Sequence, residues 1–223
     1  MHITRLELQT PDLKEQALFY GEMLQLDTRI ISGTQVLVRA GATELVFTQA
    51  NENQHGQYHF AFNIPENQFE SAKQWLAMRV EILADKDGNT TLNSETWNSQ
   101  SLYFKDTAGN ILELIARHDL QNASDQFQIL SVSEIGLATE DVFVLVKSLQ
   151  EKTGLLPYKD ESNETFTAVG DADGLFIVVQ QGRIWYPNTG VSAQLLPVHV
   201  HFQVDKTKMV LSGVPYQINL LEG

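Results

Sequence analysis

The chain has 223 residues, a formal net charge of −13 and no cysteine. An acidic chain repels the phosphates of nucleic acids and anionic lipids, so neither nucleic acid nor a membrane surface is expected as a partner. A sequence without cysteine excludes disulfides, thiolate metal sites and cysteine nucleophiles. No apolar run approaches the roughly 20 residues that span a bilayer, and no secretion signal precedes the first strand-like pattern. We therefore expect a soluble, cytoplasmic protein.

The first part of the chain predicts a strand, a helix and three further strands. Residues Ile3–Gln9 alternate between apolar and polar, which is typical of a half-buried strand. The apolar residues that follow recur at helical spacing, at Leu13, Ala17, Tyr20 and Leu24. Three strand-like runs come next, at Asp27–Ile31, Gln35–Arg39 and Thr43–Thr48. This order of elements is a βαβββ unit.

The same order recurs along the rest of the chain, at a period of about fifty to sixty residues. The second unit comprises a strand at Tyr58–Ile64, a helix at Pro65–Met78, and strands at Val80–Ala84, Ser101–Lys105 and Asn110–Ala116. After a polar linker, the third unit comprises Val132–Ala138, a helix at Asp141–Lys152, and strands near Pro157, near Phe166 and at Leu175–Gln180. A shortened fourth unit opens with Val198–Val204. The sequence thus predicts an α+β fold of tandem βαβββ modules in curled mixed sheets. Its expected domains are 1–118, a paired βαβββ domain, and 130–223, which ends in the shortened module.

Strand parity places four polar residues on the strand faces that point away from the helices. Successive side chains of a strand point to opposite faces, and the apolar neighbours of these residues are expected to pack on the helices. The four residues are Arg5, Glu44, His59 and Glu113. If the first two units lie side by side, these side chains converge in an N-terminal cleft.

Three segments resemble the vicinal oxygen chelate superfamily, which includes glyoxalases, extradiol ring-cleaving dioxygenases and bleomycin- and fosfomycin-resistance proteins. They are His2–Leu13 with Phe19 and Tyr20, Tyr58–Asn63, and Tyr103–Leu114. The most specific piece is the turn Asp106-Thr-Ala-Gly-Asn110 before an apolar strand that carries Glu113, although Thr107 stands where the family usually has proline. The resemblance is strong over 1–118 and weaker over 130–223.

The resemblance implies a divalent metal, iron, manganese, nickel or zinc, bound by His59, Glu113 and Glu44. It assigns the catalytic roles to His59 and Glu113, in a metal-dependent ring-cleavage dioxygenase or lyase. The remaining ligand position, normally histidine, is occupied by Arg5. Arginine stays protonated and cannot ligate a metal.

A metal-free pocket is therefore the alternative, in which Arg5 pairs with carboxylates and the protein binds or sequesters a small molecule, as in bleomycin resistance. The candidate substrate-binding residues are Arg5, Trp97 and Asn98, although Trp97 is equally consistent with a core contact. The expected partner is a small-molecule substrate or ligand, and a homodimer is possible.

The second half contains a rival histidine pair. His199 and His201 alternate on one face of a predicted strand, and Glu134 occupies the first-strand ligand position of the third unit. The last-strand position aligns with Asn219, where a glutamate would be needed. We therefore expect the histidine pair to be a polar sheet face, without metal.

Overall fold

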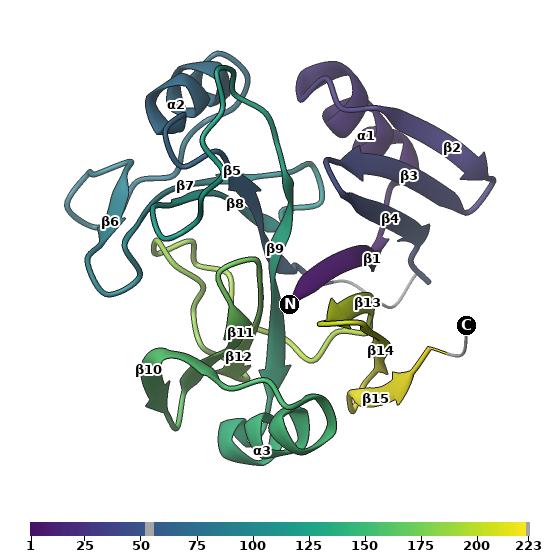
Figure 1. Cartoon of the computed structure of the whole chain (residues 1–223). Coiled ribbons are helices and arrows are strands. Elements are labelled where there is room, and N and C mark those ends of the chain that lie inside the picture. The colour runs from purple at the N-terminus through teal and green to yellow at the C-terminus, as the bar shows by residue number, and fades with distance from the viewer. Residues whose placement is uncertain (52–55, 222–223) are drawn as a thin grey trace.

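The computed structural model describes residues 1–51 and 56–221, and within them the predicted units follow one another (Figure 1). Unit 1 is β1 (His2–Thr10), α1 (Leu13–Leu18), the π-helical turn η1 (Phe19–Met23), β2 (Thr28–Ser32), β3 (Gln35–Ala40) and β4 (Thr43–Gln49). Unit 2 is β5 (His59–Ile64), α2 (Phe69–Ala77), β6 (Leu92–Ser94), β7 (Ser99–Lys105) and β8 (Ile111–Arg117). Unit 3 is β9 (Ser131–Thr139), α3 (Val142–Thr153), β10 (Pro157–Asn163), β11 (Phe166–Asp171) and β12 (Gly174–Gln180). Unit 4, in its described part, has only β13 (Val198–Val204), β14 (Thr207–Gly213) and β15 (Gln217–Leu220).

The strands form two mixed sheets, and each sheet combines an early unit with a late one. The 7-stranded sheet has the order β15-β14-β13-β1-β4-β3-β2, and the 8-stranded sheet has the order β10-β11-β12-β9-β5-β8-β7-β6. In each complete unit the first strand runs parallel to the last. The tandem βαβββ fold with curled mixed sheets is confirmed.

The expected side-by-side pairing of units 1 and 2 is wrong. The open edge of β1 pairs antiparallel with β13, and the open edge of β5 pairs antiparallel with β9. Unit 1 therefore shares a sheet with unit 4, and unit 2 with unit 3. All first strands have similar apolar alternation, so the sequence does not indicate which two of them will pair.

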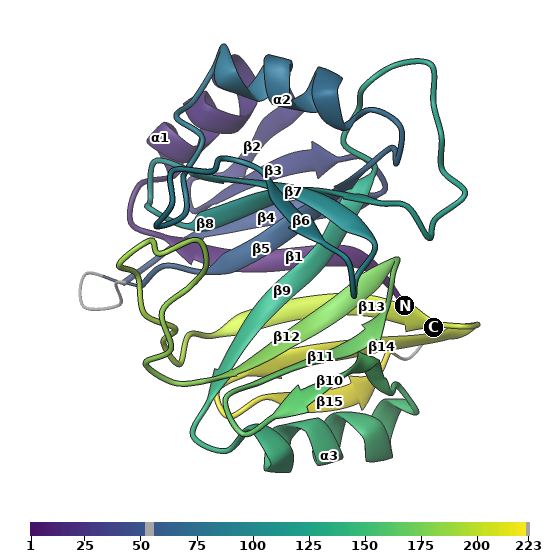
Figure 2. The same ribbon diagram turned by 90° about the vertical axis from the view of Figure 1, so that its left-hand side faces the viewer.

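Helices α1 and α2 lie on one side of the molecule, and α3 lies on the opposite side (Figure 2). The helix-facing residues of both sheets belong to one hydrophobic core, to which β1 contributes Leu6 and Leu8 and β5 contributes Phe60 and Phe62. The strand faces assigned from parity are thus confirmed. The opposite face of the larger sheet contains a second, smaller apolar cluster that includes Tyr103, Ile177 and Trp185.

One predicted strand, Val80–Ala84, is wrong. This segment is irregular and makes a single backbone hydrogen bond to β7, from Leu83 N to Tyr103 O at 2.8 Å. The edge of β7 is paired instead with the short β6. Val80 and Ile82 still pack on the core, which accounts for the strand-like alternation of this segment.

The turn between β3 and β4 connects the two sheets. Thr43 Oγ1 donates to Ile3 O at 2.7 Å and accepts from Val132 N at 3.0 Å, so it joins β1 to β9. The Ala42 amide donates to Leu130 O at 2.8 Å. Gly41, at φ +59°, lies so close to this segment that a Cβ atom would be 2.1 Å from Leu130 O. Only glycine fits this turn without displacing the start of β9.

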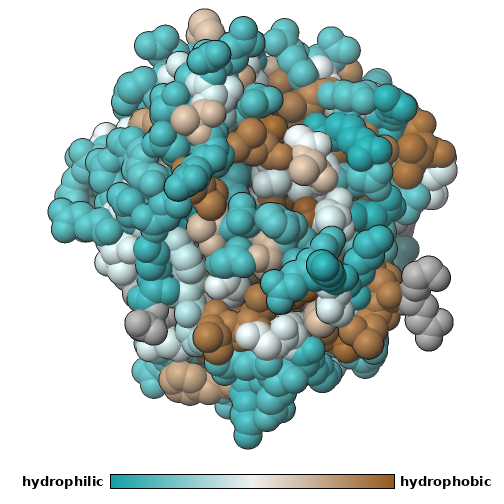
Figure 3. Space-filling view, in the orientation of Figure 1, coloured by the Kyte–Doolittle hydropathy of each residue, from teal (hydrophilic) through white to brown (hydrophobic). Residues whose placement is uncertain are grey.

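Hydrophilic side chains cover most of the face seen in Figure 3 and separate the hydrophobic areas there, in agreement with the acidic composition. Across residues 1–51 and 56–221, no helix has the length and apolar character needed to cross a membrane.

Candidate metal centre and its cavity

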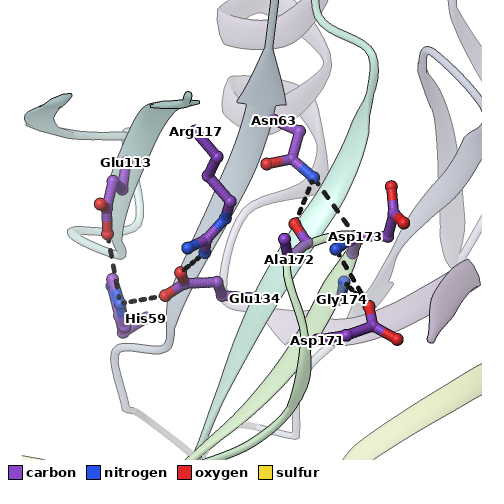
Figure 4. Close-up of polar contacts among 9 residues, drawn as sticks. All are labelled: His59, Asn63, Glu113, Arg117, Glu134, Asp171, Ala172, Asp173 and Gly174. Carbon is purple, nitrogen blue, oxygen red and sulfur yellow. Dashed lines mark hydrogen bonds and ion pairs between the residues drawn. The ribbon is translucent and has the colours of Figure 1, made fainter. Parts of the chain in front are cut away.

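Three ligand-type side chains converge on the curved inner face of the larger sheet. His59 comes from β5, Glu113 from β8 and Glu134 from β9, and Figure 4 shows them pointing toward one another. The register explains the convergence, because Ala61 of β5 lies opposite both Glu113 and Glu134. Their ligand atoms all lie within 4.8 Å of one another. All three side chains are buried.

The imidazole of His59 is oriented with Nε2 toward the two carboxylates. Its Nδ1 lies 3.1 Å from Ile111 O, and a carbonyl can only accept, so Nδ1 carries the proton. Nε2, which then carries a lone pair, lies 3.8 Å from Glu113 Oε2 and 3.9 Å from Glu134 Oε2. These separations are longer than a hydrogen bond. A backbone carbonyl that fixes one nitrogen of a histidine is the usual support for a metal ligand.

The protonation of Glu113 depends on its burial and on its neighbour Glu134. Burial, and then the charge of Glu134, raise the pKa of Glu113 to about 8. Burial also lowers the pKa of His59, so the imidazole is neutral near pH 7. Glu134 Oε1 accepts a hydrogen bond from Arg117, whose side chain is fully buried. The site thus contains a neutral imidazole, an ion-paired carboxylate and a carboxyl group that retains its proton in the absence of a nearby cation.

A cavity of about 400 Å³ opens onto these three groups. Its walls combine aliphatic and polar side chains with five aromatic ones, Trp97, Tyr103, Phe166, Trp185 and Tyr186. This volume lies in the usual range for small-molecule sites, and the combination of apolar walls with a few convergent polar groups is typical of them.

Gly136 on β9 makes room for the aromatic wall. A Cβ atom at this position would lie 2.6 Å from the Trp185 ring. That ring is in contact with the His59 imidazole, at 4.9 Å between centroids. The absence of a side chain at Gly136 therefore allows Trp185 to cover the histidine.

The structure does not bring together the four residues expected in an N-terminal cleft. His59 and Glu113 lie in the cavity, whereas Arg5 and Glu44 lie on the smaller sheet. There Arg5 Nη1 donates to Glu44 Oε2 at 2.7 Å and Arg5 Nε donates to Glu7 Oε1 at 2.7 Å. The expectation of one shared cleft is wrong because it assumed that units 1 and 2 pair. The predicted ion pair of Arg5 with a carboxylate is present.

Glu134 takes the place at the centre that the sequence assigned to Glu44. The sequence does indicate Glu134 as a candidate ligand, because it occupies the first-strand ligand position of unit 3. Its proximity to His59, however, results from the β5–β9 pairing. Trp97 lines the cavity and also packs against the smaller apolar cluster, so its role in substrate binding stays a prediction. The Asn98 side chain instead donates to Asp119 at 2.7 Å, and Asn98 is not among the residues that line the cavity.

Comparisons with known proteins agree with this architecture. No family model matches the sequence. Metallothiol transferase FosB of Staphylococcus epidermidis is 29% identical over 109 residues, which are 46% of this chain and 72% of FosB. A proposed dioxygenase from Bacillus subtilis superposes with a TM-score of 0.62 at 15% identity, over 95% of this chain and 81% of that one. Glyoxalase I from Zea mays superposes with a TM-score of 0.54 at 13% identity, over 98% of this chain and 92% of that one.

Fold, repeated units and sequence motifs agree with one another. The two whole-chain structural matches share the curled mixed sheets of tandem units, and the FosB match shows the resemblance in sequence as well. The chain therefore has the fold of the vicinal oxygen chelate superfamily, as its motifs predicted.

Proposed function

We propose that this protein is a metal-dependent enzyme of glyoxalase or extradiol-dioxygenase type that acts on a small molecule in the cavity between units 2 and 3. The observation that carries this proposal is the buried convergence of His59, Glu113 and Glu134 at the floor of the cavity. Buried carboxylates are costly unless they are paired or ligate a cation. Glu134 is paired with Arg117, whereas Glu113 has hydrogen bonds with Ser101 and Tyr103 and a pKa that is still raised to about 8.

The donor set fits a divalent ion. One imidazole and two carboxylates suit iron, manganese, nickel or zinc. His59 would ligate through Nε2, and the two glutamates each through a carboxylate oxygen. A bound ion supplies Lewis-acid chemistry to the oxygen atoms of a substrate.

The residues around the centre position the substrate and exclude water. Trp185 and Tyr103 flank His59, with ring centroids at 4.9 Å and 6.3 Å, and form apolar walls for a planar or hydrophobic substrate. Arg117 orients Glu134 by donating a hydrogen bond to Glu134 Oε1. Glu113, with a pKa of about 8, can hold a proton near neutral pH and release it when a cation or a base approaches.

Metal titration of the full chain tests this proposal. Calorimetry after chelation, with Mn²⁺, Fe²⁺, Ni²⁺ and Zn²⁺ in turn, should detect an ion that His59→Ala loses and His118→Ala keeps. His118 is the matched control because it pairs with Glu66 outside the cavity. Glyoxalase and catechol-cleavage turnover should be lost with the ion. If His59→Ala binds every ion as tightly as the parent, the centre is not a metal site.

One observation favours a metal-free binding protein as the second candidate. Arg117 already supplies a positive charge to Glu134, so part of the acidic pair is neutralised by the protein itself. This candidate predicts that small aromatic ligands quench the tryptophan fluorescence of the cavity, from Trp97 and Trp185, equally with and without a chelator. It also predicts that neither the parent protein nor His59→Ala shows any turnover.

A further inference from the structure

The smaller sheet contains a second cluster of ligand-type side chains, separate from the cavity. Glu7 of β1 and His199 of β13 lie directly opposite each other across the antiparallel pair, and His201 is opposite Arg5. Side chains that face each other across two strands share one sheet face. The ligand atoms of Glu7, His199 and His201 all lie within 4.8 Å of one another.

The two imidazoles face each other through the same nitrogen. His199 Nε2 and His201 Nε2 are 2.9 Å apart. Two nitrogens that are each ~2.1 Å from one zinc ion lie roughly 3.0 to 3.4 Å apart for ligand angles between 90° and 109°. The observed separation is therefore close to that of two ligands of one ion, and one ion could replace the proton that the two nitrogens now share.

The carboxylate is held beside the histidine pair. Arg5 Nε donates to Glu7 Oε1 at 2.7 Å, and Arg5 Nη1 donates to Glu44 Oε2 at 2.7 Å. Arg39 also pairs with Glu44, at 2.8 Å, so the two arginines and two glutamates of this face balance in charge. Arg5 thus orients Glu7, while the second oxygen of that carboxylate remains as a potential ligand.

The cluster is accessible to an ion from solution. Glu7, His199 and His201 are half-buried, in contrast to the buried centre of the larger sheet. A cavity of about 210 Å³ is lined in part by Glu7 and His199. The site requires no opening of the core.

We propose that Glu7, His199 and His201 form a second metal site, for a borderline divalent ion such as Zn²⁺. Two imidazoles and one carboxylate are typical zinc donors, and three protein ligands leave a position for water or another ligand. From the second half of the chain alone, with Asn219 at the last-strand position, a polar sheet face without metal was expected. The third ligand comes from β1, which the β1–β13 pairing brings next to the histidines.

Zinc titration in the His59→Ala background tests this second site, because the buried centre is disabled there. The full-length variant, freed of metal by chelation, should bind one Zn²⁺ in calorimetry. Adding His199→Ala or His201→Ala should weaken binding by a hundredfold or more, and adding Glu7→Gln by several-fold. Adding His118→Ala, the control, should leave the affinity unchanged. Circular dichroism melts verify that each variant is folded.

The outcomes separate this site from the proposed function. If the His59→Ala chain binds no zinc, or if its affinity survives His199→Ala, the second site does not exist, whatever the buried centre does. If parent protein loses its only zinc on His199→Ala but not on His59→Ala, this site stands and the buried centre fails. If His59→Ala does not fold, elemental analysis of the zinc-loaded parent and the zinc-loaded His199→Ala variant replaces the titration. We expect the variant to contain one zinc ion per chain fewer than the parent. An unchanged content would overturn the inference.

Discussion

At the scale of single residues, ionisation of the buried Glu113 should lower the free energy of unfolding of the metal-free chain. Its pKa is raised from 4.5 to about 8 by burial and by Glu134. The folded chain therefore binds more protons than the unfolded chain between these pH values. Its free energy of unfolding should fall as pH rises through that window.

Glu113→Gln should flatten this pH dependence, because an amide cannot ionise. The slope contributed by one such group is at most about 1.4 kcal/mol per pH unit. Urea unfolding at pH 5, 7 and 8.5 with a chelator present measures it. Glu140→Gln, at an exposed position, is the matched control and should keep the slope of the parent. An equal slope in Glu113→Gln would show that this carboxyl ionises freely in the fold.

At the residue scale, the direction of side chains along a strand could be predicted from the sequence. Alternation correctly placed His59 and Glu113 on the face away from the helices, because that pattern is local and each strand has one buried side. It could not place Glu134 beside them. The approach of Glu134 depends on a strand pairing between different units, for which the local pattern contains no information.

At the scale of elements, the β3–β4 turn is a point of close approach between the two sheets. Gly41→Ala would place a Cβ atom 2.1 Å from Leu130 O, in a backbone conformation that alanine disfavours. We expect a loss of about 2 kcal/mol or more in the free energy of unfolding, measured by urea denaturation. Gly33→Ala is the control, because its Cβ would meet nothing within 4 Å. Equal stability of the two variants would contradict the close approach at Gly41.

The sequence predicted most elements, and the exceptions have physical reasons. The third-unit helix, predicted at Asp141–Lys152, is observed as α3, where Asp141 caps the N-terminus by accepting from Val144 N. Val80–Ala84 alternates like a strand but lacks a strand partner. Periodicity reports which side of a segment is buried, whereas a strand also needs a neighbouring backbone with which to bond.

At the scale of the whole molecule, both sheets depend on pairings between strands of different units. Arg5 is opposite His201, and Ala61 is opposite Glu134. A fragment of residues 1–118 would leave β1 without β13 and β5 without β9. We expect this fragment to show no cooperative thermal transition in calorimetry, whereas the full chain should unfold in one transition. A fragment that melts cooperatively would instead support an independent domain at 1–118.

Because His59, Glu113 and Glu134 belong to one polypeptide, the buried centre is assembled by folding alone. Units 2 and 3 adjoin in sequence, so the connection of residues 118–130 between β8 and β9 sets the effective concentration at which β5 meets β9. A site whose ligands came from separate chains would lose its ligands on dilution. This one remains complete at any protein concentration at which the chain is folded, so the cell can keep the protein scarce without losing the site.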